Sequence, residues 1–184
     1  MATIILGIDP GTQLLGYGVL QSASREAQVL HSGVLRLTRI SDPYARLLAI
    51  YQHLNGVISE YRPDELAIEA PFFGKNVQAM LKLGRAQGVA ITVALSRGLP
   101  VHEYAPAKIK RAITGNGNAS KEQVARMLPQ WLKGNVKPET PDESDALATA
   151  LCRHFERQLP STQAGGRQYG GWEQFLKDNP DRVS

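Results

Sequence analysis

The segment Thr-Ile-Ile-Leu-Gly-Ile-Asp, residues 3–9, decides the fold. Its nearly continuous apolar run is typical of a central strand that is buried on both faces of a sheet. Pro10, Gly11 and Thr12 interrupt this run and leave the carboxylate of Asp9 at the carboxyl end of the strand. A carboxylate in this place is a candidate functional group, although an aspartate before Pro-Gly also fits a simple turn.

Two further strands are predicted directly after the first, at residues 16–21 and 28–37, where the apolar residues recur in a looser alternation. Their short connections predict an antiparallel meander. A fourth strand is predicted at Glu65–Glu69 and a fifth at Leu99–Tyr104, each after a helical segment that can serve as a crossover to a parallel strand. We therefore expect an α/β fold with a mixed five-stranded sheet, three antiparallel strands and then two parallel ones, flanked by helices on both faces.

Helix signals divide the rest of the chain. Helices are expected at residues 43–61, about 76–96 and 106–113, and two more begin at capping boxes, Ser120 with Gln123 and Thr140 with Glu143. The last of these helices runs to about Gln158. After Pro160 the chain is rich in Gly, Gln, Ser and charge, so we expect one domain over residues 1–158 and a flexible tail over residues 159–184.

Four acidic residues end or open elements that this fold would bring together: Asp9, Glu69, Asp142 and Asp145. Asp9 and Glu69 end strands that emerge at one edge of the sheet if the two strands are parallel neighbours. The other two acids lie three residues apart in the first turns of the last helix, on one face. Carboxylates at close range repel one another, and Mg²⁺ relieves this repulsion because it prefers oxygen ligands. The sequence therefore predicts a metal-dependent phosphoryl-transfer enzyme, against the alternative of simple helix caps and turns.

The composition indicates the class of partner. The chain has 21 Lys and Arg residues against 17 Asp and Glu, with a pI of about 9.3. This modest surplus favours a polyanionic partner if metal neutralises some of the acids. The single cysteine, Cys152, lies in an apolar helix and fits a buried residue in a reducing compartment. We find no signal peptide and no apolar run near the ~20 residues that span a bilayer, so we expect a cytoplasmic protein without membrane contact.

Three sequence blocks resemble one known family. They are Gly7-Ile8-Asp9-Pro10-Gly11-Thr12 with Gly16-Tyr17-Gly18, Ala67-Ile68-Glu69 with Phe72-Phe73-Gly74-Lys75-Asn76, and Asp142-x-x-Asp145-Ala146-Leu147-Ala148. Their order and spacing are similar to those of the RuvC family, the bacterial Holliday junction endonucleases, over roughly residues 3–157. The resemblance implies an RNase H-like fold, a homodimer, and magnesium-dependent paired nicking of four-way DNA junctions in recombination and repair, together with the branch-migration complex RuvA-RuvB.

The same resemblance implies that Asp9, Glu69, Asp142 and Asp145 are the catalytic acids and metal ligands. Some family members have a histidine at the position of Asp142, which leaves the role of this residue open. Two Mg²⁺ ions about 4 Å apart, or Mn²⁺ as a substitute, would activate water and stabilise the leaving oxygen. Asp9, on the central strand, is the best candidate to bridge them. The expected products carry 5′-phosphate and 3′-hydroxyl ends.

Further candidates for contact with DNA lie outside the acids. Phe72 and Phe73 could insert between bases, with Phe72 the better candidate for contact with DNA and Phe73 the candidate for packing inward. Lys75 could face phosphate. By the resemblance, Lys110 and Lys121 lie near the scissile phosphate, where a cation would stabilise the transition state. A solvated helix face remains the alternative for such lysines.

Other interpretations of the same sequence remain open. An ATPase of the actin and sugar-kinase type has a similar opening motif, but it needs a second domain. A protein that binds junctions without cutting them would gain nothing from acids that face phosphate. A nuclease for RNA–DNA hybrids would share the fold. The apolar face of the second helix suits either the core or a dimer interface, and it consists of Met80, Leu83, Ala86 and Val89.

Overall fold

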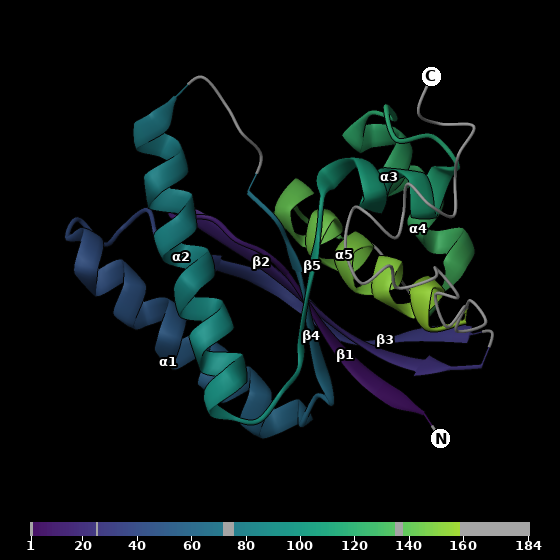
Figure 1. Cartoon of the computed structure of the whole chain (residues 1–184), viewed down its shortest axis with the longest axis horizontal. Coiled ribbons are helices and arrows are strands. Elements are labelled where there is room, and N and C mark those ends of the chain that lie inside the picture. The colour runs from purple at the N-terminus through teal and green to yellow at the C-terminus, as the bar shows by residue number, and fades with distance from the viewer. Residues whose placement is uncertain (1, 25, 72–75, 135–137, 159–184) are drawn as a thin grey trace, which may run out of the picture.

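The computed structural model describes residues 2–24, 26–71, 76–134 and 138–158. They form a twisted sheet with helices on both faces (Figure 1). The strands are β1 (Thr3–Asp9), β2 (Leu14–Ala23), β3 (Glu26–Arg36), β4 (Glu65–Glu69), β5 (Val101–Tyr104) and β6 (Leu132–Lys133). The helices are α1 (Pro43–Tyr61), α2 (Val77–Ser96), α3 (Pro106–Thr114), α4 (Lys121–Trp131) and α5 (Pro141–Gln158). None of the described helices is long and apolar enough to cross a membrane.

The sheet has the order β5-β4-β1-β2-β3-β6. Strands β1, β2 and β3 form the predicted antiparallel meander, and β4 and β5 extend the sheet as parallel strands on the other side of β1. The prediction of five strands was wrong by one. The sixth strand, β6, is a two-residue segment that pairs in parallel with β3 directly after α4, too short to show any alternation in the sequence.

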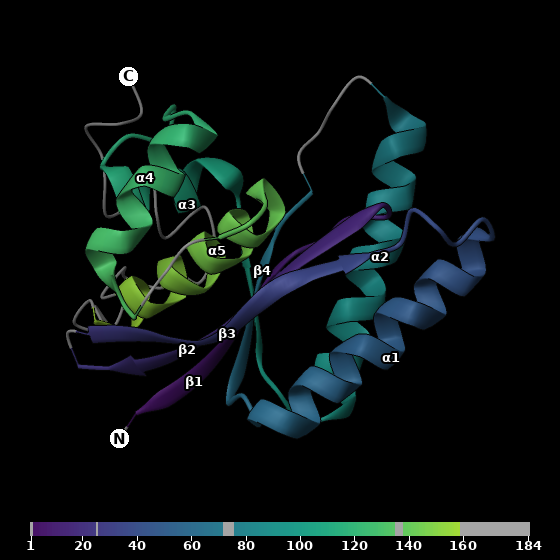
Figure 2. The same cartoon turned by 180° about the vertical axis from the view of Figure 1, so that it is seen from behind.

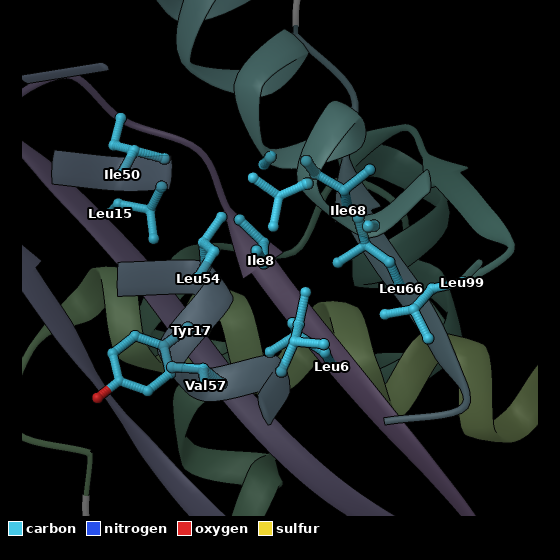
Figure 3. Close-up of a cluster of buried hydrophobic side chains, with 14 of the residues drawn as sticks. Leu6, Ile8, Leu15, Tyr17, Ile50, Leu54, Val57, Leu66, Ile68 and Leu99 are labelled. Atoms are coloured by element: carbon cyan, nitrogen blue, oxygen red, sulfur yellow. The ribbon is translucent and has the colours of Figure 1, made fainter. Parts of the chain in front are cut away.

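Alternation along β1 divides the core between the two faces of the sheet. Leu6 and Ile8 pack with α1 and α2, in the cluster shown in Figure 3. Ile5, on the other face, belongs to the cluster that includes residues of α3, α4 and α5. The two helical layers are seen from both sides in Figures 1 and 2. Asp9 shares the face of Ile5, because successive side chains of a strand point to opposite faces, so it points towards α5.

Helix α5 lies unusually close to the sheet because glycines form the surface beneath it. An added Cβ at Gly7 would lie 2.3 Å from the carbonyl oxygen of Ala146. At Gly16, which pairs with Asp9, it would lie 2.0 Å from the carbonyl oxygen of Asp142. Larger residues would lift the first turns of α5 off the strands. The glycines therefore bring Asp142 and Asp145 down to the level of Asp9.

We predict that Gly16→Ala lowers the free energy of unfolding by about 1–3 kcal/mol, the usual cost of overpacking. The melting temperature should fall by roughly 3–10 °C, as thermal denaturation would measure. Gly56→Ala in α1 is the matched control, because a Cβ there meets nothing within 4 Å and alanine is the better helix former. An unchanged melting temperature in Gly16→Ala would show that the close approach of α5 is unimportant.

The structure decides one alternative and corrects one detail of the sequence prediction. In α2, Ala86 is fully buried and Val89 packs against the core, so the core alternative holds for these two residues. At the start of α5, Thr140 caps the helix as predicted, with its Oγ1 accepting from the amide of Glu143 at 3.2 Å. The Glu143 carboxylate does not complete a capping box. It accepts instead from the amide of Glu139 at 2.8 Å and from the Ser32 hydroxyl at 2.6 Å, which tethers α5 to β3.

Candidate active site

The acids predicted from the sequence meet at one end of the sheet. In the parallel pairing of β1 with β4, Ile8 lies beside Ile68, and Asp9 and Glu69 follow them directly. The first turns of α5 add Asp142 and Asp145 from above. Asp9 has all three other carboxylates near enough to raise its pKa. Residues that are up to 136 positions apart in the sequence are thus gathered by three elements.

The carboxylates are too crowded to be fully ionised at neutral pH. Burial, followed by the charges of Glu69 and Asp145, raises the pKa of Asp9 to about 8. Burial and the charge of Asp145 raise the pKa of Glu69 to about 7. These shifts have the sign expected for like charges in a partly desolvated site. The site therefore has more negative charge than its protein surroundings compensate.

Lys121 is the cation nearest to this charge. Its Nζ forms an ion pair with Oδ2 of Asp145. Burial alone would lower the pKa of Lys121, but the hydrogen bond to Asp145 and the charges of Asp9 and Glu69 raise it. Lys121 is also among the groups that lower the pKa of Asp9 and of Glu69. The lysine at the start of α4 is therefore a built-in counterion for the carboxylates.

A cavity of about 520 Å³ opens beside the acids. Glu69, Asp145 and Lys121 form one side of it, and Lys110 from α3 contributes a second cation whose charge lowers the pKa of Glu69. The other lining residues are Ala105, Pro106, Ala107, Ile109, Gly117, Asn118, Val124 and Ala148. The cavity is large enough for a phosphodiester with its sugar, and both carboxylates and lysines line it.

The carboxylates could hold a divalent metal. Among the described residues, no three His, Cys, Asp or Glu side chains already enclose a cation site. The donor set nevertheless fits one, because it offers the oxygen ligands that Mg²⁺ prefers and has excess negative charge. Lys121 currently compensates part of that charge at Asp145. Asp9, Glu69, Asp142 and Asp145 are the residues that would hold such an ion.

The predictions for the other candidate residues differ in their outcome. Lys110 and Lys121 both line the cavity beside the acids, and their contact with the scissile phosphate stays a prediction. Phe72, Phe73 and Lys75 lie outside the described residues. Cys152 is buried, as predicted.

Sequence reasoning missed Glu65, which is buried at the start of β4. Its position four residues before Glu69 puts the two glutamates on one face of the strand, a signal that could have revealed it.

Metal-free stability should depend on pH through the crowded acids. The pKa of Asp9 rises from 3.8 to about 8 on folding, and that of Glu69 from 4.5 to about 7. A raised carboxyl pKa contributes stability that is fully present below the unfolded value and is lost as the pH rises through the folded value. Between pH 5 and pH 8.5 in EDTA, the wild-type melting temperature should therefore fall by roughly 3–8 °C more than that of Asp9→Asn. Equal losses in the two proteins would contradict the crowding of the site.

The comparisons with known proteins agree with this geometry. The sequence profile of the family described as crossover junction endodeoxyribonuclease RuvC matches residues 5–153. The chain belongs to the RuvC family. The RuvC of Porphyromonas gingivalis is 51% identical over 183 residues, covering 98% of this chain and 96% of the relative. The RuvC of Bacteroides fragilis is also 51% identical over 183 residues, covering 98% of this chain and 95% of the relative.

A solved RuvC structure has the same fold. The Thermus thermophilus RuvC in complex with a Holliday junction substrate superposes with a TM-score of 0.79 and 32% identity, covering 85% of this chain and 95% of that chain. The RNase H-like fold expected from the sequence is thus confirmed, as is membership of a nuclease family. The family match also replaces the actin-type ATPase as an interpretation of the Gly7–Thr12 motif.

Proposed function

We propose that this protein is a structure-selective endonuclease that resolves four-way DNA junctions by paired, symmetric nicks. One observation supports this most strongly: the carboxylates of Asp9, Glu69, Asp142 and Asp145 converge beside a cavity with two lysines, in a chain of the RuvC family. A RuvC relative of the same fold is known in complex with a Holliday junction substrate. Junction resolution places the activity in recombination and repair of DNA.

The four acids are the proposed ligands of two Mg²⁺ ions, with Mn²⁺ as a possible substitute. Bound there, the ions would supply an activated water and stabilise the developing negative charge. Asp9 ends the strand next to that of Glu69, and Glu69 and both α5 acids raise its pKa, which supports Asp9 as the proposed ligand shared by the two ions. Asp142 lies in the first turn of α5, where its charge also stabilises the helix dipole. Asp145 pairs with Lys121 through Oδ2, which leaves Oδ1 as a ligand atom, and both oxygens become available if Lys121 moves away.

The lysines are the proposed partners of the scissile phosphate. With a metal ion held by Asp145, the Lys121 ammonium would be available to contact a non-bridging phosphate oxygen and stabilise charge that builds up in the transition state. Lys110, on the rim of the same cavity, would hold a phosphate in place. Water adds to phosphorus as the bond to the 3′ oxygen breaks, and that oxygen takes up a proton. The products then carry 5′-phosphate and 3′-hydroxyl ends.

The wider assembly is part of the same proposal. Two copies of the chain would cut two strands of like polarity in one complex, because a two-fold dimer presents two equivalent sites. Phe72, Phe73 and Lys75, directly beyond Glu69 in the sequence, are proposed to contact the junction. The branch-migration complex RuvA-RuvB is the proposed protein partner. Light scattering of the purified protein would give its mass, and a monomer at micromolar concentration would contradict the dimer.

The function is tested by cleavage of a mobile synthetic four-way junction with Mg²⁺ or with EDTA. A linear duplex and an RNA–DNA hybrid of the same sequence serve as matched substrates. We expect symmetric, Mg²⁺-dependent nicks in the junction alone, and ends that a ligase can seal. Preferential cutting of the hybrid would indicate a ribonuclease. Binding of the junction without cutting in any divalent metal would leave a protein that recognises DNA structure.

A further inference from the structure

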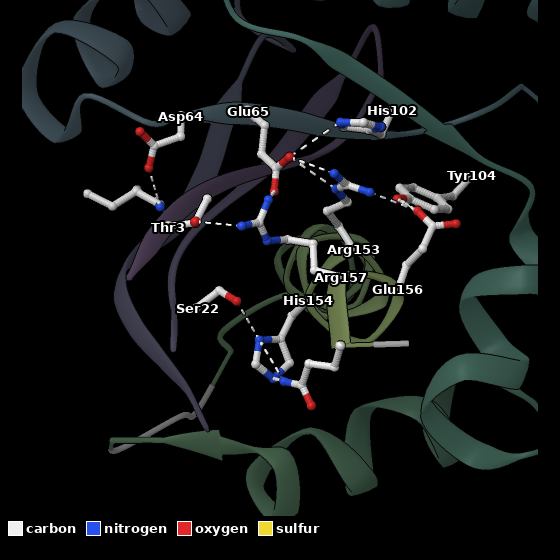
Figure 4. Close-up of polar contacts among 12 residues, drawn as sticks. Thr3, Ser22, Asp64, Glu65, His102, Tyr104, Arg153, His154, Glu156 and Arg157 are labelled. Carbon is white, nitrogen blue, oxygen red and sulfur yellow. Dashed lines mark hydrogen bonds and ion pairs between the residues drawn. The ribbon is translucent and has the colours of Figure 1, made fainter. Parts of the chain in front are cut away.

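A second charged cluster lies at the opposite end of β4 from the candidate active site. Glu65 is 3% exposed, and its carboxylate is surrounded by basic side chains (Figure 4). Arg153 of α5 donates to Oε2 from Nη2 at 2.8 Å and from Nε at 3.1 Å, and Nη1 of Arg157 donates to Oε1 at 3.2 Å. His102 of β5 lies 3.3 Å from the same carboxylate. A buried acid held this firmly fixes the groups around it, because breaking one partner leaves an uncompensated charge.

These contacts set the position of α5 along the sheet. The helix runs antiparallel to β1, since the close contacts pass from Gly16 with Asp142 to Gly7 with Ala146, and Arg157 at the far end donates to the Thr3 hydroxyl at 2.8 Å. The Ser22 hydroxyl and His154 Nδ1, 2.7 Å apart, add a buried hydrogen bond at that end. The carboxyl-terminal half of α5 is therefore anchored to the amino-terminal ends of β1 and β4.

The distance from Glu65 to Glu69 along β4 is close to the distance from Arg153 to Asp145 along α5. Glu65 and Glu69 lie on one face of β4, four residues apart, which is about 13 Å at 3.3 Å per residue. On α5, Arg153 lies eight residues after Asp145, which is about 12 Å at 1.5 Å per residue. When Arg153 pairs with Glu65, the helix is placed so that Asp145 comes to the level of Glu69.

The carboxylates need such an anchor, because they repel one another. Glu69 and Asp145 each raise the pKa of Asp9, and Asp145 also raises that of Glu69. This repulsion acts between the ends of β1 and β4 and the first turns of α5. The ion pairs of Glu65 act between the same elements at the other end of the sheet, and they are attractive. The buried ion pairs can therefore hold α5 against a force that arises at the active site.

We propose that Glu65 is a positioning residue for the nuclease site. Its ion pairs with Arg153 and Arg157 fix the axial position of α5, and thereby the separation of Asp145 from Glu69 and Asp9 on which metal binding depends. This inference rests on the proposed metal site, but its structural part can be tested without metal. Glu65 itself touches neither substrate nor metal and acts through α5.

The test compares two ways of removing the anchor. Glu65→Gln keeps the shape of the side chain and removes its charge. The double variant Glu65→Met with Arg153→Met replaces the ion pair by apolar side chains of similar volume, an exchange that often preserves stability. Leu54→Ala is the matched control, because it destabilises the core on the other face of the sheet, far from α5. Melting temperatures establish that each variant is folded at the working temperature.

The first readout is Mn²⁺ affinity without DNA, measured by isothermal titration calorimetry. We expect both Glu65 variants to bind Mn²⁺ about tenfold or more weakly, the scale of a lost supporting contact around a metal site, and Leu54→Ala to stay within about twofold of wild type. The second readout is a crystal structure of each variant without metal. In it, α5 should be displaced along its axis by about 1.5 Å or more, one residue of helical rise.

The outcomes separate this inference from the proposed function. Wild-type Mn²⁺ affinity and an unmoved α5 in a folded Glu65→Met and Arg153→Met variant would overturn the positioning role. The same result in Glu65→Gln would overturn it if the double variant does not fold. If the wild-type protein binds no Mn²⁺ at all, the metal site fails, and the position of α5 in the crystals alone decides the role of Glu65.

Discussion

Asp9→Asn is expected to abolish junction cleavage, with a loss well beyond the ~10–100-fold that follows changes around a metal site's outer contacts. Glu69 and both acids of α5 lie near enough to Asp9 to raise its pKa, so the neutral amide would remove the carboxylate that is proposed to hold both ions. Junction binding in EDTA should persist at wild-type affinity or better, because one negative charge near the phosphates is gone. Cleavage of a labelled four-way junction under single-turnover conditions, and a gel-shift titration, measure the two effects.

Asp42→Asn is the matched control for this variant. Asp42 caps α1, where its carboxylate accepts from the amide of Ala45 at 2.7 Å, and asparagine caps helices equally well. Its cleavage rate should match that of the wild type. Near wild-type cleavage by Asp9→Asn would contradict the proposed mechanism, while loss of both cleavage and binding would show that the substitution damages the DNA-binding surface or the fold.

Lys121→Met is the second variant with a large expected effect. If the Lys121 ammonium moves from Asp145 to the scissile phosphate, its removal should reduce the single-turnover rate by about 10²–10³-fold, the usual cost of losing one group that stabilises transition-state charge. Junction affinity should fall much less, because one phosphate contact among many is lost. The contrast between rate and affinity distinguishes a catalytic cation from a general DNA contact.

Two further variants make this experiment specific. Lys133→Met removes a lysine of similar exposure, paired with Glu26 on the surface, and should cut at the wild-type rate. Lys121→Arg keeps the positive charge and should recover part of the activity. A Lys121→Met rate within about threefold of wild type would mean that the lysine serves only as a counterion for the metal-free acids.

The sequence was sufficient to predict the strands and the helix that carry the acids. The apolar run ending at Asp9 predicted a central strand, and Glu65–Glu69 was predicted with the observed bounds. The capping signal at Thr140 placed the start of α5 correctly. These features are local, because burial on both faces and helix capping each leave a pattern within a few residues.

The features that the sequence did not reveal depend on contacts between distant segments. The ion pair of Lys121 with Asp145 joins α4 to α5. From the sequence alone, Lys121 could equally have been a solvent-exposed lysine on a helix surface. The contacts of Glu65 with Arg153 and Arg157 span 88 and 92 residues. Gly7 and Gly16 belong to a motif that the sequence revealed, but the reason for them, the close approach of α5, is a contact between distant segments. The contacts of Phe72, Phe73 and Lys75 stay predictions, since these residues lie outside the described part of the chain.

The most direct test of the central claim is a crystal structure with Mn²⁺, in which anomalous scattering locates the ions. We predict anomalous density among the carboxylates of Asp9, Glu69 and Asp145, with the Lys121 ammonium no longer bonded to Asp145. The Asp9→Asn crystal, treated in the same way, should lose this density. Ions bound elsewhere would contradict the assignment of these acids as the metal site. Lys121 still paired with Asp145 at saturating Mn²⁺ would contradict the proposed movement of this lysine to the phosphate.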